Sequence, residues 1–258
     1  MSFKHLTTAL LGLALAATAI AGCGDVDNGA SSGGGKTVTV FAAASLTETF
    51  TALGTTFERS HPGVRVRFNF GGSSGLAQQI TQGAPVDVFA SASPATMKTV
   101  TDADLADDRP QTFARNRLQI AVPAANPGKV ATLQDLADPD LKVVLCAEQV
   151  PCGAAAKKAL AAAKVTVKPA SLERDVKSAL NKVTLGEADA ALVYRTDVKA
   201  AGAKVIGIDF PESAQAINDY PIVTLSKAPQ PGLAKQFLQL VLSAQGRDVL
   251  TAAGFDAP

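Results

Sequence analysis

The fold is decided by two segments, Val38-Thr-Val-Phe-Ala-Ala-Ala-Ser45 and Val66-Arg-Phe-Asn-Phe-Gly-Gly-Ser-Ser-Gly75. Each predicts a buried strand that runs through small residues into a serine and then into a helix. The first N–H groups of a helix have no partner within the helix, and a serine at that place adds a hydroxyl donor. Two such ends facing each other would form a pocket of neutral donors, suited to a small anion.

Beyond these segments, short apolar runs alternate with longer helical patterns from Thr37 onward. The predicted strands are Val38–Phe41, Val64–Phe70, Val86–Ala90, Leu118–Val122, Lys142–Cys146, Ala188–Val193, Lys204–Ile208 and Ile222–Leu225. The predicted helices are Leu46–Arg59, Gly75–Gln82, Ala95–Ala103, Leu133–Ala137, Gly153–Ala163, Leu172–Leu185, Gly232–Ser243 and Ala244–Ala253. This alternation indicates an α/β fold with mostly parallel sheets, which bind ligands at the carboxyl ends of their strands.

The order of the elements predicts two lobes. We expect residues 37–115 together with residues 217–258 to form lobe I, and residues 116–216 to form lobe II. Arg115-Asn-Arg117 lies between a loop and a long apolar strand, and Asn218-Asp-Tyr-Pro221 has the composition of a turn before another strand. A chain that crosses twice in this way would form a hinge able to close on a ligand.

The N-terminus has the composition of an export signal. A positively charged start precedes the apolar run Leu10–Ile20, which is too short to span a bilayer as a stable helix. The run ends in Ile20-Ala21-Gly22-Cys23, which resembles a bacterial lipobox. We therefore expect a signal peptide at residues 1–22 and a lipid on Cys23, which would anchor the protein at the extracytoplasmic face of the cell membrane. An ordinary secretory signal with a chance cysteine is the alternative.

The composition of residues 23–36, rich in Gly, Ser and Asp, predicts a flexible linker. Beyond it, Cys146 and Cys152 are the cysteines that remain. An even number in an oxidising compartment favours a disulfide between them, and two reduced, partly buried thiols are the alternative. The chain after the signal keeps only His61 as a histidine and shows no metal-ligand spacing, so no metal site is expected.

Composition and motifs exclude several classes of function. The 258 residues carry a formal net charge of +1, without the basic excess expected of a nucleic-acid binder. A serine hydrolase needs a base beside its nucleophile, but His61 lies in a segment typical of an exposed turn. Gly72-Ser-Ser-Gly75 does not match the nucleophile motif Gly-x-Ser-x-Gly. A hydrolase using Ser45 or Ser73 is the weaker alternative, and helix capping is the simplest role for either serine.

The second half of the chain contains features that could complete the pocket. Gln149-Val-Pro-Cys-Gly153 precedes an alanine-rich run and predicts a helix start whose free N–H groups could face an anion. Ser171 is a plausible cap for the next helix. The apolar run Ala188–Val193 leads into Tyr194, whose hydroxyl can donate. A core aromatic is the simpler interpretation of that tyrosine when it is considered alone.

Taken together and in order, five segments resemble the periplasmic molybdate-binding proteins of ABC importers. They are Phe41-Ala-Ala-Ala-Ser-Leu46, Phe70-Gly-Gly-Ser-Ser-Gly-Leu76, Gly83-Ala-Pro-Val-Asp-Val-Phe89, Val150-Pro-Cys-Gly153 and Ala191-Leu-Val-Tyr-Arg-Thr-Asp197. The resemblance implies a type II periplasmic-binding fold with a ligand cleft between its lobes. It also implies a monomer without enzymatic activity or cofactor, which captures molybdate or tungstate and delivers it to a membrane permease.

The same resemblance implies which residues bind the oxyanion. Ser45 and Ser73 would supply hydroxyl and amide donors, Cys152 and Val176 backbone amides, and Tyr194 its hydroxyl. Cys152 departs from the alanine common in the family, but a backbone contact survives that change if the loop keeps its shape. A site without acceptors would bind hydrogen phosphate poorly, whereas discrimination against sulfate would depend on cavity size. The same fold with another oxyanion, such as sulfate, therefore stays open as an alternative.

Overall fold

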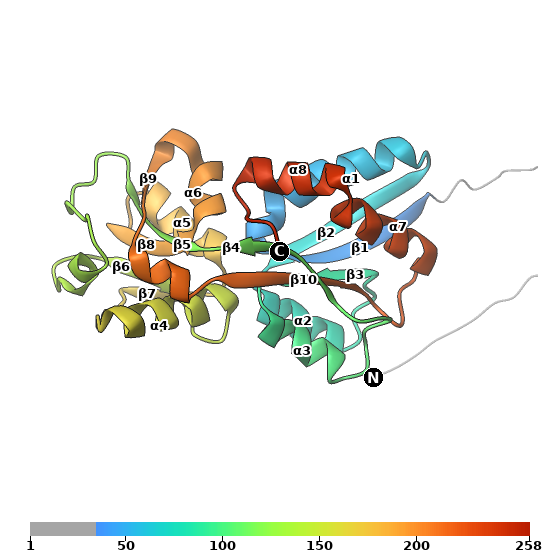
Figure 1. The fold of residues 1–258 in the computed structure, drawn as a ribbon, viewed down its shortest axis with the longest axis horizontal. Helices are drawn as coiled ribbons and strands as arrows, with labels where there is room; N and C mark the ends of the chain where they lie inside the picture. Colours follow the sequence, from blue (N-terminus) through green and yellow to red (C-terminus); the bar gives the residue numbers. More distant parts are fainter. Residues whose placement is uncertain (1–34) are drawn as a thin grey trace, which may run out of the picture. The chain divides into compact units, whose positions relative to one another are not determined.

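The computed structural model describes residues 35–258 of the chain. The predicted signal peptide, Cys23 and most of the predicted linker lie outside the described residues. Among the described residues, no helix is both long enough and apolar enough to cross a membrane. These residues form two sheets with helices packed against them (Figure 1).

The first sheet has the strand order β2-β1-β3-β10-β4. Its strands are β1 (Lys36–Ala43), β2 (Val64–Gly71), β3 (Val88–Ala90), β4 (Gln111–Asn116) and β10 (Asn218–Thr224). β1 pairs in parallel with β2 and β3, whereas β10 pairs antiparallel with β3 and β4. β10 is therefore the reversed strand in a sheet whose other strands all point the same way.

The second sheet repeats this plan with the strand order β7-β6-β8-β5-β9. Its strands are β5 (Leu118–Pro123), β6 (Val143–Cys146), β7 (Ser171–Glu173), β8 (Ala190–Tyr194) and β9 (Val205–Ile208). β6 is parallel to β7 and β8, and β5 is antiparallel to β8 and β9. The predicted two-lobed α/β fold with mostly parallel strands is confirmed.

Each reversed strand is the one that the chain enters after passing from one sheet to the other. β4 ends at Asn116 and β5 begins at Leu118, so a single residue, Arg117, links the two sheets. The chain returns from β9 through the short 3-10 helix η4 (Pro211–Gln215) into β10. The two sheets are therefore joined by short connections on both passes.

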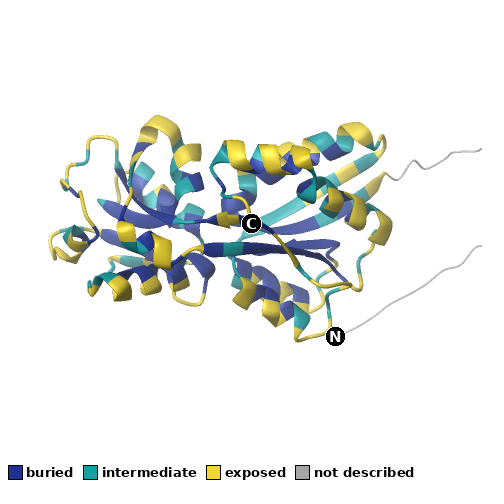
Figure 2. Ribbon diagram, in the orientation of Figure 1, coloured by how far each residue is buried: buried dark blue, intermediate teal, exposed yellow. Residues whose placement is uncertain are grey.

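Helices cover the sheets, and their outward faces are the exposed part of the molecule, whereas the central strands are buried (Figure 2). The helices are α1 (Thr47–Ser60), α2 (Ser73–Thr81), α3 (Pro94–Thr101), α4 (Pro151–Ala163), α5 (Val176–Thr184), α6 (Arg195–Ala201), α7 (Pro231–Leu242) and α8 (Ala244–Ala253), with 3-10 turns η1 (Ala44–Leu46), η2 (Gln134–Ala137) and η3 (Gly202–Lys204). Helices of this kind bury one apolar stripe against a sheet.

The two faces of β1 show how alternation along a strand divides the core. Val38, Val40 and Ala42 belong to a cluster that includes Phe50 of α1 and Phe237 of α7. Phe41, which points to the other face, belongs to a cluster with residues of α2 and α3. Successive strand residues face opposite sides, so one strand anchors helices on both faces of the sheet.

One sequence prediction was wrong at the second crossing. The segment Asn218–Pro221 is not a turn but the first half of β10, which lies between β3 and β4. Pro221 cannot donate a backbone hydrogen bond, and the strand tolerates it because the pairing with β4 shifts register between Tyr220 and Pro221. Tertiary pairing on both edges therefore overrides the local turn composition.

Three further predictions differ from the structure. Ser171 lies in β7 rather than at a helix start, and α5 begins at Val176 with Asp175 as its cap, accepting the Ser178 N–H. The predicted helix Leu133–Ala137 is the 3-10 turn η2. Strands β4 and β7 and helix α6 were not predicted, because short elements depend on pairing and packing with distant segments more than on local pattern.

Candidate functional site

The candidate site is a small cavity lined by both lobes. The space open to the centre of a water-sized sphere is about 10 Å³. That is room for about one water molecule, which is too little for an organic ligand. The residues that line it are Ala43, Ala44, Ser45, Gly71, Gly72, Ser73, Ala92, Val150, Pro151, Cys152, Asp175, Val176 and Tyr194.

Three helices begin at this cavity. Ser73 is the first residue of α2, Cys152 the second residue of α4 and Val176 the first residue of α5. The N–H groups of a helix's first turn lack intrahelical partners, and the helix dipole places partial positive charge there. Their convergence from both lobes makes the cavity favourable for an anion.

Ser45 does not cap a helix. It lies in the 3-10 turn η1 between β1 and α1, and no side chain caps either η1 or α1. Its hydroxyl is buried and makes a hydrogen bond of 2.9 Å with the hydroxyl of Tyr220 on β10. The capping interpretation is therefore wrong for Ser45, whose side chain lines the cavity instead.

The Ser73 side chain does not cap its helix either, and its hydroxyl also lines the cavity. The cap position of α2 is Gly72, and the helix has no side-chain cap. Ser73 Oγ accepts the backbone N–H of Ala92 at 3.0 Å in a buried contact. Because an N–H group can only donate, the proton of the Ser73 hydroxyl stays available to a ligand.

The buried hydroxyl of Tyr194 also indicates that the cavity binds a ligand. Its side chain is 1% exposed, and its hydroxyl has no hydrogen-bond partner among the described residues. Burial raises the pKa of this hydroxyl well above its ordinary value, so the group keeps its proton and can donate. A buried hydroxyl without a partner is costly, and a bound acceptor would remove that cost.

Cationic side chains are absent from the described residues that line the cavity. Asp175 is the carboxylate among them, and it is occupied at the start of α5. Its Oδ1 accepts the Ser178 N–H at 2.9 Å, and its Oδ2 accepts the Ser178 hydroxyl at 3.0 Å. The groups left to face a ligand are therefore neutral donors: hydroxyls and first-turn amides.

The comparison with known families agrees with this geometry. Residues 38–256 match the family model of bacterial extracellular solute-binding proteins. The chain belongs to this family. The molybdate-binding protein ModA of Mycobacterium tuberculosis is 43% identical over 262 residues, with 100% of both chains covered. ModA of Escherichia coli is 33% identical over 84% of this chain and 88% of its own.

A solved structure supports the same fold. The periplasmic molybdate-binding protein of Azotobacter vinelandii superposes with a TM-score of 0.72, covering 86% of this chain and 99% of its own at 22% identity. Like these relatives, this solute-binding protein is not an enzyme. His61 is consistent with that, since its ring stacks on Phe57 and contacts Ser60 and Gln236 rather than either serine of the cavity.

A disulfide shapes the loop that presents Cys152 in this solute-binding protein. Cys146 at the end of β6 is bonded to Cys152 near the start of α4. The residue after Cys152 packs so closely on this loop that a Cβ on Gly153 would lie 2.0 Å from the carbonyl oxygen of Ala147. Only glycine fits at that position, and the disulfide and the glycine together hold the first turn of α4 against the cavity.

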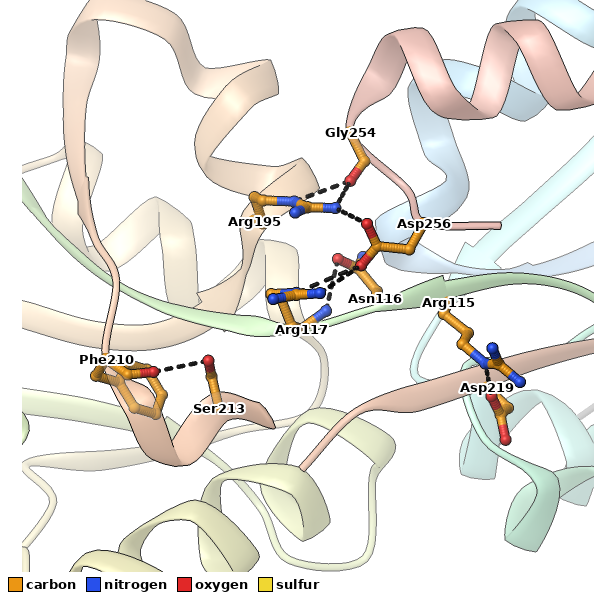
Figure 3. Close-up of polar contacts among 9 residues, drawn as sticks. All are labelled: Arg115, Asn116, Arg117, Arg195, Phe210, Ser213, Asp219, Gly254 and Asp256. Atoms are coloured by element: carbon orange, nitrogen blue, oxygen red, sulfur yellow. Dashed lines mark hydrogen bonds and ion pairs between the residues drawn. The ribbon is translucent and has the colours of Figure 1, made fainter. Parts of the chain in front are cut away.

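The lobes approach each other closely at the cavity's edge. A Cβ on Gly72 would lie 2.3 Å from the carbonyl oxygen of Arg174 in the other lobe. A second connection lies where the C-terminal tail after α8 meets α6 and the first crossing (Figure 3). There Asp256 forms ion pairs with Arg195 at 2.8 Å and with Arg117 at 3.1 Å.

The ion pairs at the C-terminal tail also change the pKa of Asp256. Burial raises the pKa of Asp256, but the hydrogen bonds and charges of Arg195 and Arg117 outweigh this and lower it below its usual value. The carboxylate is therefore ionised at neutral pH and holds the tail to both the crossing residue and α6. Arg195 also donates to the carbonyl oxygen of Gly254.

The structure brings Ser45, Ser73, Cys152, Val176 and Tyr194 to one cavity. Sequence reasoning missed Tyr220, which touches Ser45, because its segment has turn composition. One signal was available, since the chain has only two tyrosines and Tyr220 follows a predicted crossing. Within residues 35–258, no group of three or more His, Cys, Asp or Glu side chains could hold a metal ion.

Proposed function

We propose that this solute-binding protein captures molybdate, and tungstate as well, in the cavity between its lobes and delivers the oxyanion to the permease of an ABC importer. The observation that carries the proposal is the convergence of donors on the cavity: two buried serine hydroxyls, three helix starts and the Tyr194 hydroxyl, which has no partner among the described residues. A buried dianion is costly unless its oxygens accept hydrogen bonds. The full-length identity of 43% to a molybdate-binding protein supports this choice of ligand.

Five residues would hold the oxyanion. Ser45 and Ser73 would donate through their hydroxyl and amide groups, Cys152 and Val176 through backbone amides, and Tyr194 through its hydroxyl. Neutral donors placed in advance favour a fully deprotonated tetrahedral anion, because they offer protons to its oxygens, and the Asp175 carboxylate in the lining already accepts from Ser178.

The remaining parts of the proposal concern the whole chain. Lobe I would comprise residues 37–115 and 217–258, and lobe II residues 116–216, so that ligand is enclosed when the lobes close about the crossings. After removal of residues 1–22, a lipid on Cys23 and a linker to residue 36 would tether a monomer outside the cell membrane.

Isothermal titration of the protein with molybdate, tungstate, sulfate and phosphate tests this proposal. We expect one-to-one binding of molybdate and tungstate and little or no binding of phosphate. Sulfate has the same charge and shape as molybdate but is smaller, so equal affinity for both would favour a general oxyanion receptor. Absence of heat with all four anions would overturn the proposal.

A further inference from the structure

Tyr220 lies behind the cavity wall, and its hydroxyl oxygen is 2.9 Å from Ser45 Oγ. The side chain is fully buried, and its ring packs edge-on against Tyr194, Phe113 and Phe255. Because these rings surround it, the Tyr220 hydroxyl has a fixed place. It makes a hydrogen bond with one of the two serines that line the cavity.

Asn116, at the end of β4, donates a hydrogen bond to Tyr220. Its Oδ1 accepts the Arg117 N–H at 3.0 Å, so its Nδ2 faces Thr196 Oγ1 at 2.8 Å and the Tyr220 hydroxyl oxygen at 3.5 Å. An amide NH₂ group can only donate. The Tyr220 oxygen therefore accepts from Asn116, which leaves the Tyr220 proton free for Ser45 Oγ, although either hydroxyl can be the donor in that hydrogen bond.

With Tyr220 as the donor, Ser45 Oγ accepts and the Ser45 proton is left for the cavity. Ser73 shows the same arrangement with a different donor, because its Oγ accepts the Ala92 N–H. In this arrangement another donor occupies the serine oxygen in both cases, and the serine hydrogen is left for the ligand. The donor to Ser73 is backbone, whereas the donor to Ser45 is a side chain that can be changed.

We propose that Tyr220 is a positioning residue for oxyanion binding, holding the Ser45 hydroxyl as a donor toward the ligand. This inference rests on the proposed function. It assigns Tyr220 no contact with the ligand, so its contribution passes through Ser45 alone. Consecutive hydrogen bonds of this kind also strengthen one another, which makes Ser45 a better donor than an isolated serine.

The test is a double-mutant cycle in the whole protein, with molybdate affinity as the measurement. Tyr220→Phe keeps the ring and removes one hydroxyl, and it should weaken binding about 2- to 10-fold, the range of one neutral hydrogen bond. In a Ser45→Ala background the same change should cost nothing further. In a Ser73→Ala background it should cost as much as in the wild type, since Ser73 has its own donor.

Two controls separate positioning from general loss of stability. Thr49→Val removes a buried hydroxyl of α1 that donates to the carbonyl of Leu46 in the preceding turn η1, and it should leave affinity unchanged. The melting temperature of each variant is measured in parallel, because a purely structural role would weaken binding equally in both serine backgrounds.

The outcomes distinguish this inference from the proposed function. Additive losses for Tyr220→Phe and Ser45→Ala, or an unchanged affinity for Tyr220→Phe alone, would overturn the role of Tyr220 while molybdate binding stands. A wild-type protein that does not bind molybdate would overturn the proposed function and this inference with it.

Discussion

Lys177 of α5 forms an ion pair with Glu48 of α1, with its Nζ 2.8 Å from Oε1 and 3.0 Å from Oε2. The two residues belong to different lobes, and each stands next to the cavity in sequence: Lys177 follows Val176, and Glu48 is three residues after Ser45. The same Nζ lies 3.3 Å from Oδ1 of the buried Asp197. One lysine thus ties both lobes together beside the candidate site.

We expect Glu48→Gln to speed dissociation of the oxyanion, because the variant removes an attraction that favours the closed arrangement. The Glu48 side chain is 52% exposed, so solvent screens the pair and the effect should be modest, up to about 1 kcal/mol. Stopped-flow measurement of the dissociation rate checks this. Asp102→Asn removes an exposed pair with Lys98 inside lobe I and serves as the control. Equal rates in wild type and Glu48→Gln would contradict the expectation.

Ser45→Ala and Ser73→Ala should each weaken molybdate binding by about 1.5–3 kcal/mol, the usual worth of a hydrogen bond to a charged group. The physical reason is that each serine hydroxyl lines the cavity and is left free to donate. Isothermal titration measures the loss. Ser74→Ala is the matched control, since Ser74 adjoins Ser73 but does not line the cavity. Unchanged affinity in both site variants would mean that the ligand binds elsewhere.

Removal of the disulfide should weaken binding without unfolding the protein. Cys146→Ser combined with Cys152→Ser frees the loop before α4, so the Cys152 amide is less well positioned for a ligand. The expected loss is about 1 kcal/mol, near that of one hydrogen bond. Titration of the double variant and circular dichroism of its fold test this. Wild-type affinity in the double variant would show that Gly153 and Pro151 alone hold the loop.

Much of the site follows from local sequence. The strand–serine–helix segments place Ser45 and Ser73, and the run Gln149–Gly153 predicts the start of α4, because apolar runs and helix starts have local signatures. Val176 came from family resemblance rather than pattern. Its helix was predicted four residues too early, since Leu172 resembles a helical residue but pairs with Leu145 of β6.

What the sequence could not predict depends on contacts between distant segments. Tyr220 reaches Ser45 across 175 residues, and Lys177 reaches Glu48 across 129. No local composition marks such pairs. Asn218–Pro221 has turn composition, yet pairing with β3 and β4 makes it part of a central strand. The sequence therefore predicts the residues that line the site better than the residues that surround it, such as Tyr220 and Lys177.

Asp197 should make the folded protein less stable as the pH rises, which is the opposite of the usual effect of a carboxylate. Its carboxylate is fully buried, with Oδ2 accepting the Tyr194 N–H at 3.2 Å. Burial raises the pKa of Asp197 from 3.8 to about 6, although Lys177 acts in the opposite direction. The folded state therefore holds this proton more tightly than the unfolded state does. The resulting stabilisation is complete below about pH 4 and is lost as the pH rises through 6.

Asp197→Asn removes this titration while keeping a side chain that can accept the Tyr194 N–H. Between pH 4 and pH 7 the wild type should lose on the order of 1–3 kcal/mol of unfolding free energy relative to the variant. Urea denaturation of both proteins at the two pH values gives the difference, and all other titrating groups cancel in it. Parallel pH profiles would show that Lys177 keeps Asp197 ionised in the folded state. In that case the ion pair would outweigh burial, and the lysine that joins the lobes would also be the group that keeps this charge in place.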